Sequence, residues 1–313
     1  MATASVFSFK FTPQLQAHLS QLPPSVSLDR LSRLSPERLK STALPNIGSI
    51  ELVSSEAFDS VYDSMYVSMF PRREERERSD LIVDRLAAQY AGQREHLATY
   101  RIVGIRDDKG EAIGAAQFSV LPLPALEGEA EEGAKFAVPY LQYIYIRPQN
   151  RRQDMSEVLH TLVLAVSAAD AAKDGRTVPF TLYETEPPGH GADEVSRAYA
   201  SQRARIHANA GGVALVLRRQ SDSSIISAHV QPGLEVGDSP LTLTWVIRPS
   251  PDPGREYDVA QIGRSLVAAY YSSLRDEGFP EVNIRLAETI VEKRYDGCEF
   301  HLMPLADVKD HVE

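Results

Sequence analysis

The pattern of apolar and polar positions is clearest between residues 139 and 170. Residues 141–146 are largely apolar and rich in aromatic and β-branched types, which predicts a strand buried on both faces. Pro148 then ends the strand, because proline has no N–H to donate to a neighbouring strand. The next segment predicts a long helix with one apolar face, since apolar residues recur at helical spacing: Met155, Val158, Leu159, Leu162, Val163 and Val166.

The turn that joins this strand to this helix, residues 149–154, has the composition of an anion-binding site. It contains Arg151 and Arg152 and leads into a helix N-terminus. Free backbone N–H groups and the helix dipole favour a negatively charged ligand at such a place. The same residues also allow a plain turn that Asp154 caps and that binds nothing. From the residues alone, both interpretations stay open.

Segments on both sides of this unit also have strand and helix patterns. Upstream, they predict strands over 49–54, 98–106 and 112–121, with helices after Ser55 and after Ser79. Downstream, they predict strands over 178–183 and 213–218 and a helix over 194–210 between them. The last part of the chain predicts strands over 241–247, 282–286 and 298–302, and a helix capped by Asp258.

The spacing of residues around the turn resembles a known family signature. Ile146, Pro148 and Arg151 are followed by Asp154 and Ser156. This resembles the GNAT superfamily of N-acetyltransferases, which has here a β-branched residue, often a proline, an Arg or Gln, a glycine and a small residue. The order of elements over 49–219 is similar too. The chain departs from the signature at Asp154, because the family's glycine lets backbone approach phosphate without a side chain.

The resemblance implies a site for acetyl-CoA as co-substrate, in a reaction that needs no metal. The turn would hold the pyrophosphate of acetyl-CoA, and N–H groups of the preceding strand would polarise the thioester carbonyl. The residues implied in this binding are Tyr143, Ile144, Tyr145, Ile146, Arg151, Arg152, Gln153, Asp154, Met155 and Ser156.

The general base is not obvious from the resemblance. Gln142 stands where some members of the family have a catalytic glutamate, and an amide cannot take up a proton. Glu184 and Glu186 are the alternatives, because they follow the strand predicted over 178–183, and open α/β sheets place ligands at the carboxyl ends of parallel strands. Both glutamates could equally be ordinary surface acids.

The general acid has one candidate, His207. In the family, a tyrosine that protonates the departing CoA thiolate lies four residues before the glycine that closes the helix. His207 holds this position relative to Gly211, and histidine can donate a proton near neutral pH. If Gly212 is the equivalent glycine instead, the position falls on Ala208 and no acid remains.

Charge and cysteine content narrow the class of protein. The chain has 33 Lys+Arg and 43 Asp+Glu, a net charge of −10, which disfavours a nucleic-acid partner and suits an amine-bearing substrate. The single cysteine, Cys298, cannot form an intramolecular disulfide or a cysteine-based metal site, and it fits a reducing compartment. We expect no secretion signal and no membrane-spanning stretch, and therefore a cytoplasmic protein without a membrane partner.

The predicted fold is α/β, of GNAT type: a mixed, mostly antiparallel central sheet flanked by helices, with an α/β C-terminal extension. We expect an N-terminal arm over 1–47, an acyltransferase domain over 48–250 and a helix and strand extension over 251–313. The arm is rich in proline, and its short amphipathic pieces would dock on the parent domain or on a second copy. The second arrangement would make a homodimer.

These patterns favour acyl transfer from acetyl-CoA to an amine of a small molecule or a peptide. The alternative is a GNAT-type fold that only binds or assembles, because Gln142, Asp154 and the missing tyrosine all depart from the catalytic pattern. A third reading is an unrelated α/β enzyme. Binding of CoA is the observation that would separate these readings most sharply.

Overall fold

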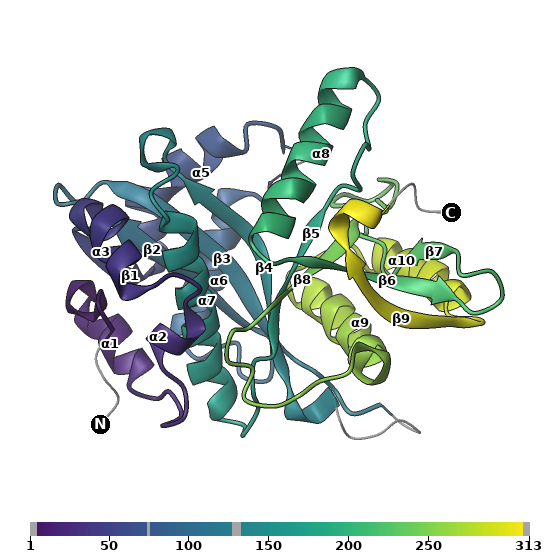
Figure 1. The fold of residues 1–313 in the computed structure, drawn as a ribbon, viewed down its shortest axis with the longest axis horizontal. Helices are drawn as coiled ribbons and strands as arrows, with labels where there is room; N and C mark the ends of the chain where they lie inside the picture. The colour runs from purple at the N-terminus through teal and green to yellow at the C-terminus, as the bar shows by residue number, and fades with distance from the viewer. Residues whose placement is uncertain (1–4, 74–75, 127–132, 309–313) are drawn as a thin grey trace. The chain divides into compact units, whose positions relative to one another are not determined.

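The computed structural model describes residues 5–73, 76–126 and 133–308 (Figure 1). The chain folds into two compact units. The first consists of Met1–Pro122, Phe136–Pro179 and Ser250–Arg255, and the second of Leu123–Lys135, Phe180–Pro249 and Glu256–Glu313. The N-terminal 47 residues belong to the first unit. Most of the predicted C-terminal extension, residues 256–313, shares the second unit with residues 180–249, so the units divide the chain at other points than the predicted domains.

The first unit is built on four antiparallel strands in chain order, which confirms the predicted antiparallel character of the sheet. They are β1 (Ser49–Leu52), β2 (Thr99–Arg106), β3 (Ala112–Pro122) and β4 (Ala137–Ile146). Each matches a predicted strand, and β4 is longer than expected because Ala137, Val138 and Pro139 still pair with β3.

Helices cover both faces of this sheet. Side chains alternate along a strand, so Tyr100 and Ile102 of β2 face one side and Arg101 faces the other. The first side packs on Phe58, Tyr62 and Tyr66 in an aromatic cluster. That cluster comes from α4 (Ser55–Ala57), the π-helical turn η3 (Phe58–Tyr62), α5 (Asp63–Met69) and α6 (Ser79–Tyr90). The other side packs on α7 (Met155–Ala172).

The N-terminal segment lies beside α7 and β1 (Figure 1). Apolar residues spaced along its short helices, including Leu15, Leu31 and Leu39, are buried. The predicted arm therefore docks on its own chain. Its elements are η1 (Ser8–Lys10), α1 (Pro13–Leu19), α2 (Leu28–Leu31), α3 (Pro36–Thr42) and η2 (Leu44–Asn46).

Helix α7 corrects one expectation from the sequence. It is long and apolar enough to cross a membrane by length and composition, although we expected no such stretch. Most of the helix is buried against β2, β3 and β4 and against the N-terminal helices. Its apolar composition is therefore that of a core helix, because it is covered on several sides and not along one narrow stripe.

An acidic side chain near the C-terminal end of α7 joins three elements. Asp170 is 7% exposed and accepts hydrogen bonds from Arg101 of β2, at 2.9 and 3.0 Å. Lys173 donates to the same carboxylate at 2.9 Å, and His18 of α1 lies 3.7 Å away. Burial alone would raise the pKa of Asp170, but Arg101, His18 and Lys173 hold it below its ordinary value. The helix is thereby fixed to the sheet and to the N-terminal segment.

The strands of the second unit pair antiparallel with one another in the order β5 (Phe180–Thr185), β8 (Thr244–Pro249), β6 (Val213–Arg219) and β7 (Ile225–Ser227), with β9 (Cys298–Pro304) also on β6. The other elements are η5 (Gly133–Lys135), α8 (Glu194–Asn209), α9 (Val259–Asp276), α10 (Glu281–Arg294) and η7 (Leu305–Asp307). Asp258 caps α9 as predicted, through the N–H of Ala260.

The strand predicted over 282–286 is wrong. These residues lie in α10, where Ile284, Ala287 and Val291 are buried. The alternation of apolar and polar residues over five positions suggested a strand, whereas the spacing of the buried residues over the whole segment is helical. Five residues are too short a window to separate the two periods.

We expect Asp170→Ala to lower the free energy of unfolding by about 3–5 kcal/mol, because it leaves the mostly buried Arg101 guanidinium without its carboxylate. Asp174→Ala, at an exposed position after α7, should change it by less than about 0.5 kcal/mol. Urea unfolding at pH 7 measures both. The folded pKa is depressed, so the contribution is present above the ordinary pKa and is lost as the pH falls through the folded one. Equal effects of the two variants would contradict this account.

Candidate functional site

Strand β4 contains a β-bulge next to the turn singled out by the sequence. Tyr143 pairs with Gln117 of β3 and Leu141 pairs with Phe118, so Gln142 is the extra residue. A bulge takes one residue out of the regular ladder and redirects the strand around it. Gln142, Tyr143 and Ile144 are all half-buried, whereas Tyr145 is buried. The irregular part of β4 is therefore also its more accessible part.

The turn after β4 is held in place by Arg147. Its guanidinium donates to Asn150 at 2.8 Å, to Asp107 at 3.0 Å and to Glu111 at 3.1 Å. Asp107 and Glu111 flank the turn between β2 and β3, so the turn after β4 is tied to its neighbour. Asn150 is buried and donates in turn to Gln153 at 3.1 Å. The backbone of the turn is thus preorganised by its own side chains.

Asp154 occupies the position at which the resembled family has glycine, and its backbone conformation explains why glycine suits it. Its φ of 59° and ψ of 12° lie in the left-handed region, where glycine is favoured and Asp is tolerated. The residue is at the N-cap position of α7, as the sequence allowed, but its side chain does not cap the helix. Its carboxylate accepts hydrogen bonds from Arg38 Nε at 2.6 Å and from Thr42 Oγ1 at 2.5 Å instead.

The remaining residues of the turn present backbone and cationic groups. Arg151 and Arg152 are exposed, and so is Ser156 in the first turn of α7. The side chain of Met155 is buried, so only its backbone could reach a ligand at the turn. The first helical hydrogen bonds come from Glu157 and the residue after it, both to the carbonyl of Asp154. The N–H groups before them belong to the free donors of a helix start.

The glutamate predicted as a base, Glu184, belongs to a buried polar cluster in the second unit. His229 Nε2 lies 2.5 Å from its Oε1, and the hydroxyl of Tyr270 donates to the same oxygen at 2.9 Å. His229 is fully buried and stacks on Trp245, with ring centroids 4.4 Å apart. Burial lowers the pKa of His229 although Glu184 opposes the shift, so the imidazole is neutral and its Nε2–H donates to the carboxylate.

Two polar atoms of this cluster have no hydrogen-bond partner among the residues that the structure describes: His229 Nδ1 and Trp245 Nε1. Burying an ionisable pair with unsatisfied neighbours costs stability, which an apolar core would avoid. Neither His229 nor Tyr270 is predicted as a site residue from the sequence. The single tryptophan, Trp245, was the only sign of this cluster, and it does not reveal its partners.

His207 lies on the face of β5 opposite to the side chain of Glu184. Its ring is 4.8 Å from the ring of Tyr183, which precedes Glu184 in β5 and therefore points to the opposite side. Helix α8 ends at Asn209 with Ala210 as its C-cap, and Gly211 follows with a φ of 84° and an N–H that donates to the carbonyl of Ala208. Gly211 is therefore the glycine that closes the helix, and His207 stands four residues before it.

The surroundings of His207 bear on its predicted role. Burial, together with the charges of Arg203 and Arg248, lowers its pKa to about 4. Near pH 7 the imidazole is then neutral. Its role as proton donor stays a prediction. The role requires turnover to rise as the pH falls, because only about one molecule in a thousand carries the proton at pH 7.

Glu186, the second predicted base, lies just beyond the end of β5. Its carboxylate forms an ion pair with Arg203 of α8 at 2.9 Å, and about a third of its side chain is exposed. Glu184 and Glu186 thus have different surroundings, one in a buried cluster and one in a surface ion pair. The turn residues belong to the first unit, and Glu184, Glu186 and His207 belong to the second.

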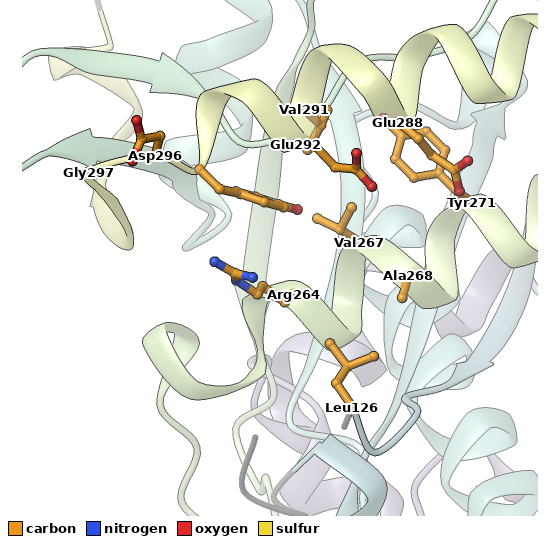
Figure 2. A pocket seen from close by; sticks show the side chains of 11 residues that line it. Leu126, Arg264, Val267, Ala268, Tyr271, Glu288, Val291, Glu292, Asp296 and Gly297 are labelled. Atoms are coloured by element: carbon orange, nitrogen blue, oxygen red, sulfur yellow. The ribbon is translucent and has the colours of Figure 1, made fainter. Parts of the chain in front are cut away.

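The second unit also has a cavity of about 750 Å³ between α9 and α10 (Figure 2). Its carboxylates are Glu288, Glu292 and Asp296, and the Arg264 guanidinium lies 4.9 Å from the ring of Tyr295. Acidic groups outnumber basic ones, so the lining favours a cation over an anion. The full lining is Leu126, Arg264, Val267, Ala268, Tyr271, Glu288, Val291, Glu292, Tyr295, Asp296 and Gly297.

Comparison of the sequence with family models and with curated proteins finds no match. Solved structures resemble the fold at low sequence identity. A protein of Bacteroides thetaiotaomicron ascribed to the GNAT family of acetyltransferases is 12% identical, with a TM-score of 0.41, over 72% of this chain and 97% of that chain. These values describe a distant likeness.

Two further solved structures contain acetyl-CoA. One is a GNAT superfamily phosphinothricin acetyltransferase from Sinorhizobium meliloti, 14% identical, with a TM-score of 0.37, over 67% of this chain and 92% of that chain. The other is NAA60 from Arabidopsis thaliana, 8% identical, with a TM-score of 0.37, over 63% of this chain and 95% of that chain. The GNAT superfamily, to which the Sinorhizobium meliloti enzyme is ascribed, is the one whose signature the sequence resembles.

We expect the imidazole of His207 to titrate near pH 4, because it is partly buried beside two arginines. NMR of the ring protons, assigned by comparison with His207→Gln, measures this midpoint. The folded pKa is below the ordinary value of about 6.5, so the unfolded chain binds more protons between the two values. Stability should therefore fall as the pH drops from about 6.5 to about 4, and His207→Gln should weaken this dependence. A midpoint near 6.5 would contradict the described surroundings.

Proposed function

We propose that the chain is an acyl-CoA-dependent N-acyltransferase that transfers an acetyl group from acetyl-CoA to an amine of a small molecule or peptide. The observation that carries the proposal is the turn between β4 and α7. A bulged strand, a preorganised turn with two exposed arginines and a helix start follow one another there, and the carboxylate of Asp154 is paired with Arg38. Pyrophosphate is the kind of anion that such a turn accommodates.

Acetyl-CoA would supply the activated acyl group. Arg151, Arg152 and the backbone N–H groups from Gln153 to Ser156 hold the phosphates, and N–H groups of β4 from Tyr143 to Tyr145 polarise the thioester carbonyl. The side chain of Met155 is buried, so this residue contributes only its backbone N–H to the binding of acetyl-CoA. These residues bind and orient the substrate, and much of the rate of such a reaction comes from orientation.

The proposed general base is Glu184, and Glu186 is its alternative. Glu184 accepts the proton that the attacking amine loses, while His229 and Tyr270 hold its carboxylate through Oε1. Glu186 is the weaker candidate, because Arg203 already pairs with it at the surface. The amine nitrogen and the thiolate sulfur are bound to the same carbon in acyl transfer, so a general base and a general acid must both reach that point. Glu184 and His207 lie on opposite faces of β5, so each is a separate candidate and is tested by its own variants.

A protein that binds CoA without turnover is the second candidate function. It is favoured by Gln142, which stands at the family's glutamate position, and by the neutral state of His207 near pH 7. Such a module would keep the turn and its affinity for CoA. Assay of CoA release with a panel of primary amines separates the two functions, because only the enzyme consumes acetyl-CoA.

Acetyl-CoA should bind with a dissociation constant on the order of micromolar and raise the melting temperature, because a ligand bound only by the folded state stabilises it. Arg151→Ala should weaken binding by about 1.5–3 kcal/mol through loss of a charge-assisted hydrogen bond. Isothermal calorimetry measures both.

Arg285→Ala is the matched control for this measurement. It removes an exposed arginine of the second unit that pairs only with Glu281 among the described residues, so it should leave the affinity unchanged. Absence of heat and of a thermal shift at millimolar acetyl-CoA would contradict the proposed function. Equal losses in both variants would show a general effect of charge instead.

Glu184→Gln should lower kcat by about 10²–10⁴-fold for an amine that the wild type acetylates, because an amide of the same shape cannot accept the proton. Acetyl-CoA affinity should stay within about twofold, since the residue does not belong to the turn. Glu186→Gln is the control and should retain most activity. If Glu186→Gln loses activity and Glu184→Gln keeps it, the roles of the two glutamates are reversed.

His207→Ala should lower kcat and kcat/KM together, by up to about 10²–10⁴-fold, if the imidazole donates the proton to the thiolate. With a pKa of about 4, the wild-type rate should then rise with falling pH and the variant should not. His207→Tyr should keep most activity. Unchanged turnover of His207→Ala at every pH would make His207 a packing residue.

A further inference from the structure

We infer that Arg38 and Thr42 of the N-terminal segment complete the anion site at the β4–α7 turn, by neutralising Asp154 and by presenting the Arg38 guanidinium to phosphate. The inference rests on the proposed function, because the anion is the pyrophosphate of an acyl-CoA. It adds residues from outside the segment that resembles the GNAT pattern, which starts near Ser49. Helix α3 would then be part of the substrate site and not a mere support.

The carboxylate of Asp154 is held by two residues of helix α3. Its left-handed backbone turns the carboxylate towards α3, where Arg38 Nε donates at 2.6 Å and Thr42 Oγ1 at 2.5 Å. Partial burial alone would raise the pKa of Asp154, but these hydrogen bonds hold it below its ordinary value, so the carboxylate is charged at neutral pH. The N-terminal segment also engages the next acid of α7, because the Arg33 N–H donates to Glu157 at 3.0 Å.

The negative charge of Asp154 would affect the binding of an anion at this turn. A bare carboxylate at this turn would repel a pyrophosphate. Glycine, which the resembled family has at this position, carries no side chain and so causes no repulsion. The ion pair with Arg38 offsets that charge, so Asp154 no longer opposes Arg151 and Arg152 of the turn. An aspartate is therefore compatible with an anion site here only while Arg38 stays in place.

The guanidinium of Arg38 has donors to spare beyond its bond to Asp154. Only its Nε donates to Asp154, and its two terminal nitrogens donate to no atom among the residues that the structure describes. About half of its side chain is exposed. A guanidinium is a fork of five donors, so one edge can hold the carboxylate while another meets a phosphate oxygen.

The test is a double-mutant cycle measured by calorimetry with acetyl-CoA. Arg38→Gln should weaken binding by about tenfold or more, because it removes a charge-assisted contact and exposes Asp154 to the phosphates. Asp154→Asn, which tolerates the left-handed backbone, should bind at least as tightly as wild type. In the Asp154→Asn background, Arg38→Gln should cost clearly less, since the uncompensated charge is gone.

The matched control is Arg30→Gln in the same N-terminal segment. Arg30 pairs with Asp252 at 3.1 Å and does not contact the turn, so its loss should leave acetyl-CoA affinity unchanged. S-acetyl-pantetheine, which lacks the phosphates, is the second probe, and its binding should respond equally little to Arg38→Gln and to Arg30→Gln. Circular dichroism and thermal unfolding of each variant confirm that it is folded.

Each of three results would overturn the inference alone. The first is that Arg38→Gln binds acetyl-CoA as tightly as Arg30→Gln does, and the second is that Arg38→Gln loses the same affinity in the wild-type and in the Asp154→Asn background. The third is that Arg38→Gln loses as much affinity for S-acetyl-pantetheine as for acetyl-CoA. If neither the wild type nor any variant binds acetyl-CoA, the inference falls together with the proposed function. The wild-type measurement therefore tells the two failures apart.

Discussion

The first unit depends on the way in which helix α7 is fixed at both ends by acidic side chains. At its start, Asp154 is held by Arg38 and Thr42, and near its end Asp170 is held by Arg101. Apolar burial places the helix on the sheet, but it does not fix its position along its own axis. The two polar contacts do so. Because α7 begins at the turn after β4, they also determine where the free N–H groups of the helix start are presented.

This arrangement shows how a departure from a sequence signature can be compensated elsewhere in the chain. The position needs a left-handed backbone, which glycine supplies freely and aspartate supplies at some cost. The charge of aspartate would work against an anion, and the pairing with α3 removes that objection. A second departure, Gln142, has no such local remedy, because the extra residue of the bulge is a half-buried amide that cannot act as a base. In the proposed function, the proton goes to Glu184.

The sequence predicted the central strand, turn and helix well. The strand is a continuous apolar run ended by Pro148, and the helical spacing of apolar residues is kept over Met155–Val166. It also located the antiparallel strands and the cap of α9 at Asp258. It failed where the window was short, as in residues 282–286 of α10. It could not reveal contacts between distant residues: Arg38 meets Asp154 across 116 positions, and His229 meets Glu184 across 45. Neither pair leaves a local pattern, since each forms only after the chain has folded.

The same limit applies to the chemistry of His207. Its position before Gly211 is readable from the sequence, but its lowered pKa comes from burial and from Arg203 and Arg248, which the fold brings near. Residue type alone therefore indicated a proton donor, whereas the surroundings set the pH at which it could act. Spacing in a sequence indicates geometry more reliably than it indicates protonation state.

The most direct test of the central claim is hydrogen–deuterium exchange, with and without CoA, followed residue range by residue range. CoA should slow exchange of the backbone N–H groups in residues 146–158 and in α3 (Pro36–Thr42), because the ligand would rest on the turn and engage Arg38. Protection confined to other parts of the chain, with these two segments unchanged, would contradict the assignment of the β4–α7 turn as the acyl-CoA site.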